Sequence, residues 1–241
     1  MDEIVLSQMI GIEDRHWWYL ARRRIVEAMI ARTVLGGTEI LDMGCGGGGN
    51  CPMLARFGRV RGVEMDPAAR AAAESRRICE VADGFLPDGI PFGTDRFDLV
   101  TLLDVLEHVP EDGLSVRRLA ERLNPGGLIV ATVPAHMFLW RKQDELNRHQ
   151  RRYTRRQLES VFTGNGFRVE HATYYNVLLF PLIAGIILGN KWLGREQADD
   201  NRIPPAPVNW VLWKVLALER WLVPRLCFPF GASILLVARK D

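Results

Sequence analysis

Residues 38–66, TEILDMGCGGGGNCPMLARFGRVRGVEMD, limit the fold of this chain more than any other segment. A short apolar run ends on Asp42, and a glycine string from Gly44 to Gly49 follows it. A helix-length interval leads to a second apolar run, which ends on Glu64. A strand, a glycine turn, a helix and a strand with a terminal carboxylate are typical of a nucleoside-binding βαβ unit. We therefore expect Glu64 to accept the ribose hydroxyls of a nucleoside ligand.

The acid that precedes the glycine string indicates which ligand fits. Gly44, Gly46 and Gly49 match the dinucleotide fingerprint G-x-G-x-x-G, but any glycine string offers this spacing. A dinucleotide would bring a pyrophosphate to the helix N-terminus, where Asp42 would repel it. S-adenosylmethionine instead carries an ammonium group and a cationic sulfonium, which a carboxylate attracts. The charge pattern therefore favours S-adenosylmethionine, with an NAD-dependent oxidoreductase on a similar half-fold as the alternative.

Several motifs in a fixed order resemble those of a known family. The runs LDMGCGGG, VEMD, VADG and FDLVTLLDVLEHV follow one another within residues 38–135. Together they resemble the class I S-adenosylmethionine-dependent methyltransferases. The runs HWWYLARRR and WRKQDELNRHQRRYT resemble a bacterial subgroup whose members accompany glycan, lipid or natural-product pathways. The resemblance implies a Rossmann-like sheet of seven strands, the last one antiparallel, and an N-terminal helix that covers the cofactor.

Apolar periodicity and turn residues predict an α/β fold with a doubly wound sheet. The expected strands are residues 38–42, 59–64, 78–82, 97–103, 128–133, 167–174 and 233–238. The expected helices are residues 8–34, 51–57, 68–77, 111–123 and 154–165. The 241 residues are expected to form a single domain. Its four parts are an N-terminal helical lid (1–37), a cofactor-binding core (38–174), an apolar helical insertion (175–231) and the last strand (232–241).

The carboxyl ends of the parallel strands are expected to hold the cofactor. By the resemblance, Asp42 faces the methionine moiety, Asp83 accepts the adenine amino group, and Leu103 lies near the sulfonium. Arg22 is expected to clamp the methionine carboxylate as a bidentate pair, with a solvated helix face as the alternative. The expected cofactor-binding residues are Asp42, Gly44, Cys45, Gly46, Glu64, Met65, Asp83, Gly84, Leu103, Trp18 and Arg22.

Methyl transfer needs little from the protein beyond alignment, because the sulfonium is already a strong electrophile. An oxygen or nitrogen nucleophile must lose a proton, and histidine is the commonest base. His108, soon after the fourth strand, is the first candidate, and His136 and His149 are rivals. A lone histidine is nevertheless more often structural. We expect His108, His149 and Asp144 to be catalytic, with Asp144 holding an acceptor hydroxyl.

Residues 148–156, RHQRRYTRR, carry five arginines in a short segment. Thr154 lies where a helix N-cap is expected. The expected acceptor-binding residues are His136, Arg151, Arg152 and Tyr153. The two arginines suit an anionic group, and a solvated charged face is the alternative. Because the patch is local and the formal net charge is only +2, no nucleic-acid partner is predicted.

The core fold does not require residues 175–231. Residues 177–189, VLLFPLIAGIILG, are almost wholly apolar but too short to span a bilayer. A proline-rich loop over residues 197–207, expected to be mobile, precedes a second apolar stretch at 208–223. Four of the seven tryptophans fall in the insertion. Three interpretations stay open: peripheral contact with a membrane, a lid over an apolar acceptor pocket, or a homodimer interface.

The four cysteines lack metal-ligand spacing, as do the histidines and acids, so no metal is predicted. The absence of a signal peptide favours a cytoplasmic protein, with membrane association as the alternative. We expect an enzyme that transfers a methyl group from S-adenosylmethionine, by in-line displacement, to an oxygen of a small-molecule, glycan or lipid-linked acceptor. A further alternative is an inactive cofactor-binding partner that is recruited to a membrane.

Overall fold

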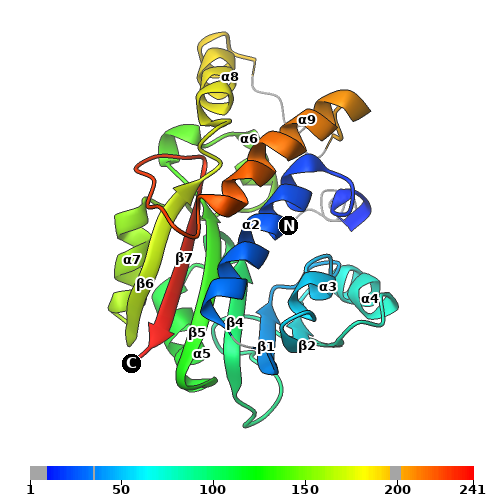
Figure 1. Cartoon of the computed structure of the whole chain (residues 1–241), viewed down its shortest axis with the longest axis vertical. Coiled ribbons are helices and arrows are strands. Elements are labelled where there is room, and N and C mark those ends of the chain that lie inside the picture. The colour runs from blue at the N-terminus through cyan, green and yellow to red at the C-terminus, as the bar shows by residue number, and fades with distance from the viewer. Residues whose placement is uncertain (1–9, 35, 196–201) are drawn as a thin grey trace.

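The computed structural model describes residues 10–34, 36–195 and 202–241 and contains a seven-stranded sheet flanked by helices (Figure 1). The strand order is β3-β2-β1-β4-β5-β7-β6. The strands are β1 (Thr38–Met43), β2 (Gly58–Val63), β3 (Glu80–Ala82), β4 (Phe97–Leu103), β5 (Leu123–Pro134), β6 (Phe167–Tyr175) and β7 (Ser233–Lys240). β7 is antiparallel to both neighbours, and the other strand pairs are parallel. The expected seven-stranded sheet is confirmed, including its antiparallel last strand.

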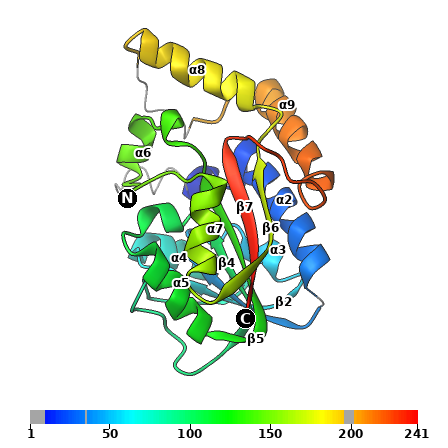
Figure 2. The ribbon, with the colours of Figure 1, turned by 90° about the vertical axis from the view of Figure 1, so that its left-hand side faces the viewer.

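Helices cover both faces of the sheet. α2 (Trp17–Thr33), α3 (Cys51–Leu54) and α9 (Ala206–Ala217) bury apolar side chains against one face (Figure 1). α5 (Asp112–Glu121) and α7 (Arg155–Thr163) do so against the other (Figure 2). The remaining helical segments are α4 (Pro67–Ser75), α6 (Lys142–Leu146), α8 (Phe180–Trp192) and the 3-10 turns η1 (Leu106–His108), η2 (Met137–Leu139) and η3 (Leu218–Trp221). One apolar core therefore lies on each side of the sheet, as a doubly wound fold requires.

The boundaries of several elements differ from the sequence-based expectations. The helix expected over residues 8–34 is broken, and α2 begins after His16, whose imidazole accepts a hydrogen bond from Trp18 N at 3.3 Å. Residues 1–9 lie outside the described part of the chain. β5 begins at Leu123 rather than at residue 128, because the segment between them continues the strand with a shifted register against β4. Thr154 is confirmed as an N-cap, and its hydroxyl accepts a hydrogen bond from Gln157 N at 3.3 Å.

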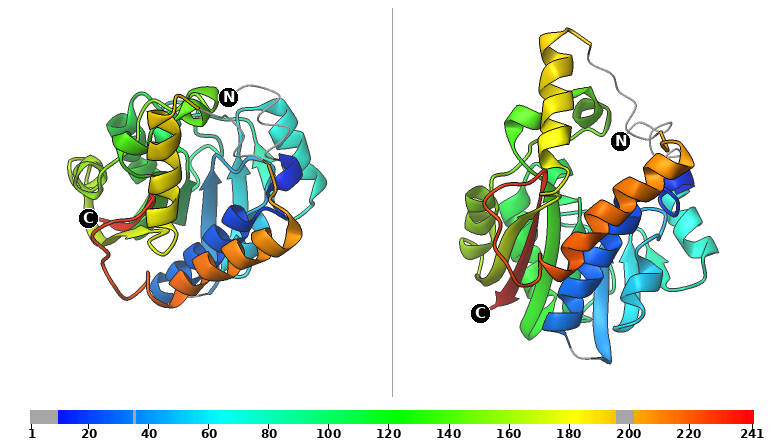
Figure 3. Two further views of the ribbon diagram at one scale, coloured as in Figure 1. Left: turned by 90° about the horizontal axis from the view of Figure 1, so that it is seen from above. Right: turned by 45° about the horizontal axis from the view of Figure 1, so that its top comes forward.

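Within the insertion, α9 packs along the N-terminal helix α2 (Figure 3). Asn209, on α9, makes two hydrogen bonds to the start of the chain. Its Oδ1 accepts from Trp17 N at 2.9 Å, and its Nδ2 donates to the carbonyl of Arg15 at 2.9 Å. The insertion therefore supports the N-terminal helix α2, although the two segments lie far apart in the sequence.

A buried carboxylate anchors the insertion to the sheet. Glu219, on η3, is fully buried, and its two oxygens accept hydrogen bonds from the backbone N–H groups of Asn176, Val177 and Leu178 at 2.6, 2.8 and 2.9 Å. These three donors lie in the turn between β6 and α8. Burial raises the pKa of Glu219, while the three N–H groups favour its ionised form. This carboxylate thus holds the turn from which α8 departs.

Among the helices of the described residues, α8 exposes the most large apolar side chains. Only Ile187 of its residues is buried, and α8 projects beyond the carboxyl ends of the parallel strands (Figure 2). Its Lys191 donates a hydrogen bond to the carbonyl of Phe138 at 3.1 Å, next to η2. No helix of the described residues combines the length and the apolar character that a bilayer crossing needs. Residues 196–201, part of the expected proline-rich loop, lie outside the described part of the chain.

We predict that Glu219→Ala destabilises the protein, because one buried and two partly buried N–H groups then lose their acceptor. Each stranded group costs about 1–3 kcal/mol, so a loss of about 3 kcal/mol or more in the free energy of unfolding is expected. Urea denaturation followed by circular dichroism measures it. Glu74→Ala, at an exposed position on α4, is the control and should change stability little. An equally small effect of both substitutions would contradict the anchoring role.

Candidate cofactor and acceptor site

A glycine loop follows β1 at the carboxyl edge of the sheet. The N–H groups of Gly44 and Cys45 both donate to the carbonyl of Val63, at 2.8 and 3.0 Å, which turns the chain sharply across the end of β2. Gly44 has a φ of 74°, and a Cβ there would lie 2.6 Å from a methyl group of Val105. Only glycine therefore allows the loop to pass this close to the segment after β4.

Asp42 lies buried immediately before this loop, with one oxygen unpaired. Its Oδ1 accepts a hydrogen bond from the Thr101 hydroxyl at 2.6 Å, whereas its Oδ2 has no partner among the described residues. Burial raises the pKa of Asp42 to about 6, against the opposing effect of Thr101. A buried carboxylate without a full set of partners is costly. The site therefore suits a ligand that brings a positive charge or hydrogen-bond donors to this oxygen.

Glu64 and the residues around it form the adjoining part of the carboxyl edge. Glu64 follows β2, and its two oxygens accept hydrogen bonds from Gly46 N and Asp66 N, both at 2.9 Å. Glu64 is therefore tied to the glycine loop, and its expected contact with the ribose hydroxyls stays a prediction. Met65 is largely exposed beside it, and Asp83, after β3, pairs with Arg70.

The other expected cofactor residues occupy the same edge. Gly84 follows Asp83 and is buried, and a Cβ there would lie 2.5 Å from the carbonyl oxygen of Gly89. Cys45 is buried in the glycine loop, and Leu103 is the last residue of β4. The fold thus brings together, at the ends of β1 to β4, the residues that sequence analysis assigned to the cofactor.

The N-terminal helix reaches this edge through Arg22. The guanidinium is buried, forms an ion pair with Asp104 directly after β4, and donates to the carbonyl of Leu103 at 3.5 Å. It also lies over the ring of Trp18, 4.8 Å from the centroid. Arg22 is therefore not on a solvated face. Its expected role as a clamp for the methionine carboxylate stays a prediction, and in this structure its charge is matched by Asp104.

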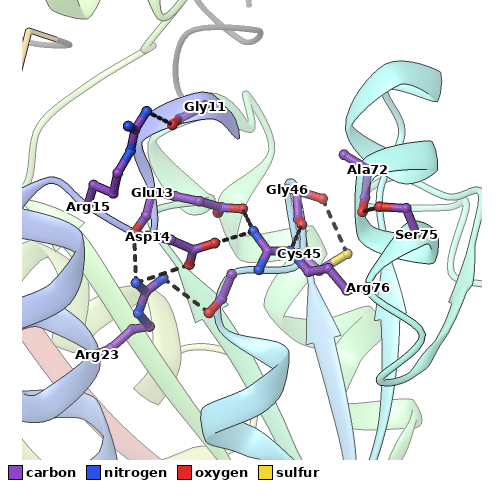
Figure 4. Close-up of polar contacts among 12 residues, drawn as sticks. Gly11, Glu13, Asp14, Arg15, Arg23, Cys45, Gly46, Ala72, Ser75 and Arg76 are labelled. Carbon is purple, nitrogen blue, oxygen red and sulfur yellow. Dashed lines mark hydrogen bonds and ion pairs between the residues drawn. The ribbon is translucent and has the colours of Figure 1, made fainter.

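The segment just before α2 covers the glycine loop, which sequence analysis missed. Arg76 donates to the carbonyl of Gly47 and to the carboxylate of Glu13, each at 2.6 Å. Arg23 donates to the carbonyls of Gly49 and Glu13 at 3.1 and 2.7 Å. Figure 4 shows both arginines pointing toward the acidic side chains of this segment. The available signal was the run of three arginines at residues 22–24, but a charge run gives no indication of its partners.

Asp144, one of the residues expected to contact the acceptor, organises a buried network. Arg152 grips it as a bidentate pair, with Nε to Oδ1 at 2.9 Å and Nη2 to Oδ2 at 2.8 Å. Nδ1 of His149 lies 2.8 Å from Oδ1. Burial alone would raise the pKa of Asp144, but the hydrogen bonds from His149 and Arg152 lower it to about 2. Asp144 is thus a fixed anion that positions His149, and Arg152 already has an internal carboxylate partner.

The two histidines expected to be catalytic lie side by side. The rings of His108 and His149 are 4.6 Å apart and nearly perpendicular. Burial, aided by the neighbouring His149, lowers the pKa of His108 to about 3, so this imidazole is neutral near pH 7. Burial also raises the pKa of the adjacent Glu107 well above its usual value. The expectation that no metal-ligand cluster exists rested on spacing along the chain, yet folding brings Glu107, His108 and His149 within ligand distance of one another.

Two further expected acceptor-binding residues share one acidic partner. Arg151 donates to Asp112 at 2.8 Å and to the carbonyl of Pro110 at 2.8 Å, and the hydroxyl of Tyr153 donates to the same carboxylate at 2.8 Å. Burial raises the pKa of Tyr153. Both side chains therefore brace the segment after β4. Their expected contact with an anionic acceptor stays a prediction.

His136 lies at the end of β5 in an aromatic stack. Its ring is nearly parallel to that of Tyr174, with centroids 4.9 Å apart, and it also stacks on Phe138 at 5.1 Å. Its φ of 61° is left-handed, and its Nε2 is buried with no partner among the described residues. Burial lowers its pKa. His136 also borders the start of α8, where its ring lies 6.1 Å from that of Phe180.

The sheet order, the glycine loop and the acids at the carboxyl edge define a nucleoside-binding α/β domain. A family model described as a methyltransferase domain matches residues 15–172. The ubiquinone biosynthesis O-methyltransferase of Azorhizobium caulinodans is 37% identical over 105 residues. That alignment covers 41% of this chain and 41% of that protein, so the match spans about two fifths of the curated relative.

Solved structures share the fold over nearly the whole chain. One chain of the complex between the Haloferax volcanii Trm112 methyltransferase activator and a putative methyltransferase has a TM-score of 0.63 at 18% identity, covering 99% of this chain and 95% of that chain. An S-adenosylmethionine-dependent methyltransferase from Mesorhizobium loti has a TM-score of 0.59 at 19% identity, covering 95% and 100%. The chain belongs to this methyltransferase family, with the class I fold.

The cofactor that this family implies is S-adenosylmethionine, and the residues present fit it. The unpaired oxygen of Asp42 suits a cationic ligand, and the glycine loop offers backbone without a Cβ beside it. Glu64 is the carboxylate that would take the ribose. The negative charge of Asp42 at this position disfavours a pyrophosphate, as the sequence predicts.

We predict that Asp42→Asn removes a pH-dependent destabilisation. Because the folded-state pKa of Asp42 is raised from 3.8 to about 6, the native state holds this proton longer than the unfolded state does. Its contribution therefore lowers stability as pH rises from about 4 to 6, by about 3 kcal/mol at about 1.4 kcal/mol per pKa unit. Urea denaturation at pH 4 and pH 7.5 should show a variant that gains stability relative to the wild type at the higher pH. Asp88→Asn, at an exposed site, is the control, and a constant difference between variant and wild type would contradict the shift.

Proposed function

We propose that the protein transfers the methyl group of S-adenosylmethionine to an oxygen atom of a small-molecule acceptor. The observation that carries this proposal is the buried, half-paired carboxylate of Asp42 beside a glycine loop that also contacts Glu64. Asp42 attracts the cationic end of the cofactor, and Glu64 binds the ribose. Oxygen as the acceptor atom is supported by the O-methyltransferases that resemble about two fifths of the chain.

The residues of this chain would contribute positioning and the exclusion of water. The cofactor supplies an activated methyl group when bound. Arg22 and Asp104 brace the end of β4, and the segment with Glu13 closes over the glycine loop through Arg23 and Arg76. His149, held by Asp144, is the group proposed to take the proton of the acceptor hydroxyl. Burial lowers the pKa of His108 to about 3, which makes this imidazole a weak base.

We predict that the wild-type protein binds S-adenosylhomocysteine in a calorimetric titration and gives no heat with NADH. Glu64→Ala should weaken this binding by about tenfold or more, because the ribose hydroxyls lose a charge-assisted hydrogen bond worth about 1.5–3 kcal/mol. Glu80→Ala, exposed on β3, is the matched control and should bind normally. Heat with NADH but not with S-adenosylhomocysteine would favour the oxidoreductase alternative and overturn the proposal.

A transfer assay separates an enzyme from an inactive cofactor-binding protein. The donor is radioactive S-adenosylmethionine. The candidate acceptors come from a bacterial extract that has been freed of small thiols and endogenous cofactor. We expect label in an organic-extractable product, and none with a wild-type protein denatured beforehand. Cofactor binding without any transferred label would support the inactive-partner alternative.

We further propose that the exposed apolar face of α8 contacts lipid, which suits a lipid-linked acceptor. Large apolar side chains of α8 are exposed to solvent: Leu182, Ile186, Leu188 and Trp192. Trp192 is 87% exposed, which is unusual for the largest apolar side chain. Tryptophan beside apolar residues is typical of a membrane interface. The position of α8 next to η2 and His136 would bring a lipid-linked group toward the carboxyl edge.

We predict that the protein floats with anionic phospholipid vesicles and that the double variant Ile186→Glu, Trp192→Glu does so at least about tenfold less. Transferring the two apolar side chains from water into lipid is expected to contribute more than about 1.4 kcal/mol to the binding free energy, and the double variant loses this contribution. Ile78→Glu, which removes an exposed apolar side chain far from α8 in sequence, is the control and should float normally. A wild-type protein that does not float but elutes as a dimer, disrupted by the double variant, would replace the membrane contact with a homodimer interface.

A further inference from the structure

Three potential metal ligands meet just beyond the carboxyl end of β4. The cluster of Glu107, His108 and His149 offers one carboxylate oxygen and two imidazole nitrogens, and these atoms all lie within 4.8 Å of one another. Glu107 and His108 belong to η1, whereas His149 comes from the segment after α6. We propose that Glu107, His108 and His149 form a site for a divalent transition-metal ion at the acceptor side of the cofactor site.

The ligand types define which ion the site would take. Two imidazoles and one carboxylate are typical ligands of zinc, manganese, iron and cobalt, whereas magnesium and calcium prefer oxygen ligands alone. Three protein ligands leave at least one coordination position open, which is typical of catalytic rather than structural metal sites. A divalent transition ion is therefore a better match than magnesium.

The carboxylate of Glu107 supports the site independently of the histidines. Glu107 is 1% exposed, and its Oε2 has no hydrogen-bond partner among the described residues. Two nearby cations are already matched by other carboxylates, Arg22 by Asp104 and Arg152 by Asp144. A buried carboxyl group whose oxygen lacks a donor is expensive unless a cation or a proton accompanies it. A metal ion would supply that missing positive charge.

Both histidines have the outer partners that metal-bound imidazoles usually have. Nδ1 of His149 lies 2.8 Å from Asp144, which is itself held by the bidentate pair with Arg152. The ring of His108 hydrogen-bonds to the backbone of Asn147. A ligating histidine commonly donates its second ring N–H to a carboxylate or a backbone carbonyl, which orients the ring. For His149 this leaves Nε2 free to face the cluster.

The backbone fixes the two halves of the cluster against each other. Gln150 N donates to the carbonyl of Glu107 at 2.6 Å, and His149 N donates to the carbonyl of Asp144 at 2.9 Å. The first bond joins the segment after α6 directly to η1, and the second ties His149 to α6. The three ligand atoms are therefore assembled by rigid main-chain contacts and not by flexible side chains alone, so little ordering would be needed on binding.

The location gives the ion a specific task, which rests on the proposed function. An acceptor hydroxyl that coordinates a divalent ion has a lowered pKa and releases its proton to solvent near neutral pH. The resulting oxygen anion then forms the new O–CH3 bond as the S–CH3 bond of the cofactor breaks, leaving neutral S-adenosylhomocysteine. With the ion bound, His149 would therefore act as a ligand and the proton would leave to solvent, whereas in the metal-free protein His149 would be the base proposed above.

Metal binding by the full-length protein tests the proposal directly. Protein stripped with a chelator is titrated with Co²⁺ and Zn²⁺, following the visible absorption of Co²⁺ and the heat of Zn²⁺ binding, with Mg²⁺ for comparison. We expect one transition ion per chain and much weaker binding of Mg²⁺. Glu107→Gln should weaken Co²⁺ and Zn²⁺ binding at least tenfold while the fold stays intact, since the substitution removes a buried unpaired charge without changing shape.

Two controls make every outcome decisive. Glu145→Gln, at an exposed position on α6, should bind metal as the wild type does. His149→Gln should also lose metal, and circular dichroism verifies that each variant is folded. A wild type that binds no transition ion, or a folded Glu107→Gln variant that binds it unchanged, overturns the site. Binding of S-adenosylhomocysteine, measured on the same samples, tells failure of the metal site apart from failure of the proposed function.

Discussion

Buried negative charge at the carboxyl edge of the sheet is the constraint on which this structure depends. The parallel strands end at the same edge of the sheet, and several acidic side chains near this edge are buried when the helices pack on the sheet. Arg22 from the N-terminal helix balances Asp104, and Arg152 balances Asp144. Asp42 and Glu107 keep one buried oxygen each without a partner among the described residues. The two unpaired oxygens mark the places where the protein can accept positive charge from outside the chain.

The shared edge of the residues expected to bind the cofactor could be predicted from sequence, because these residues are close together in the chain. Asp42, the glycine string and Glu64 belong to a single βαβ unit, so their spacing alone determines that they share an edge. β4 was likewise predicted to the residue, since a strand buried on both faces has an unbroken apolar pattern. The contribution of Glu13 was not predictable, because it depends on where the chain before α2 folds back.

For the residues expected to bind the acceptor, residue types alone could not predict the contacts, because their partners come from other segments of the chain. Arg151, Arg152 and Tyr153 form a conspicuous polar run, and a run of arginines indicates equally a solvated face or an anion site. In the fold each of these side chains meets a carboxylate of the protein, Asp112 or Asp144. Likewise, the approach of His149 to His108 depends on the path of the loop after α6, which has no local sequence signature.

Asn209 gives the insertion a consequence for how the chain can be divided. Its amide joins α9 to the residues that enter α2, and α2 in turn supplies Arg22 to the end of β4. A protein trimmed to its sheet and flanking layers would therefore lose the contacts that hold the start of α2, the helix that carries Arg22. The insertion is an addition to the core fold in the sequence, yet it fixes the position of the N-terminal helix in the structure. A segment transferred from a related protein to this position must therefore keep an amide that makes the same two hydrogen bonds.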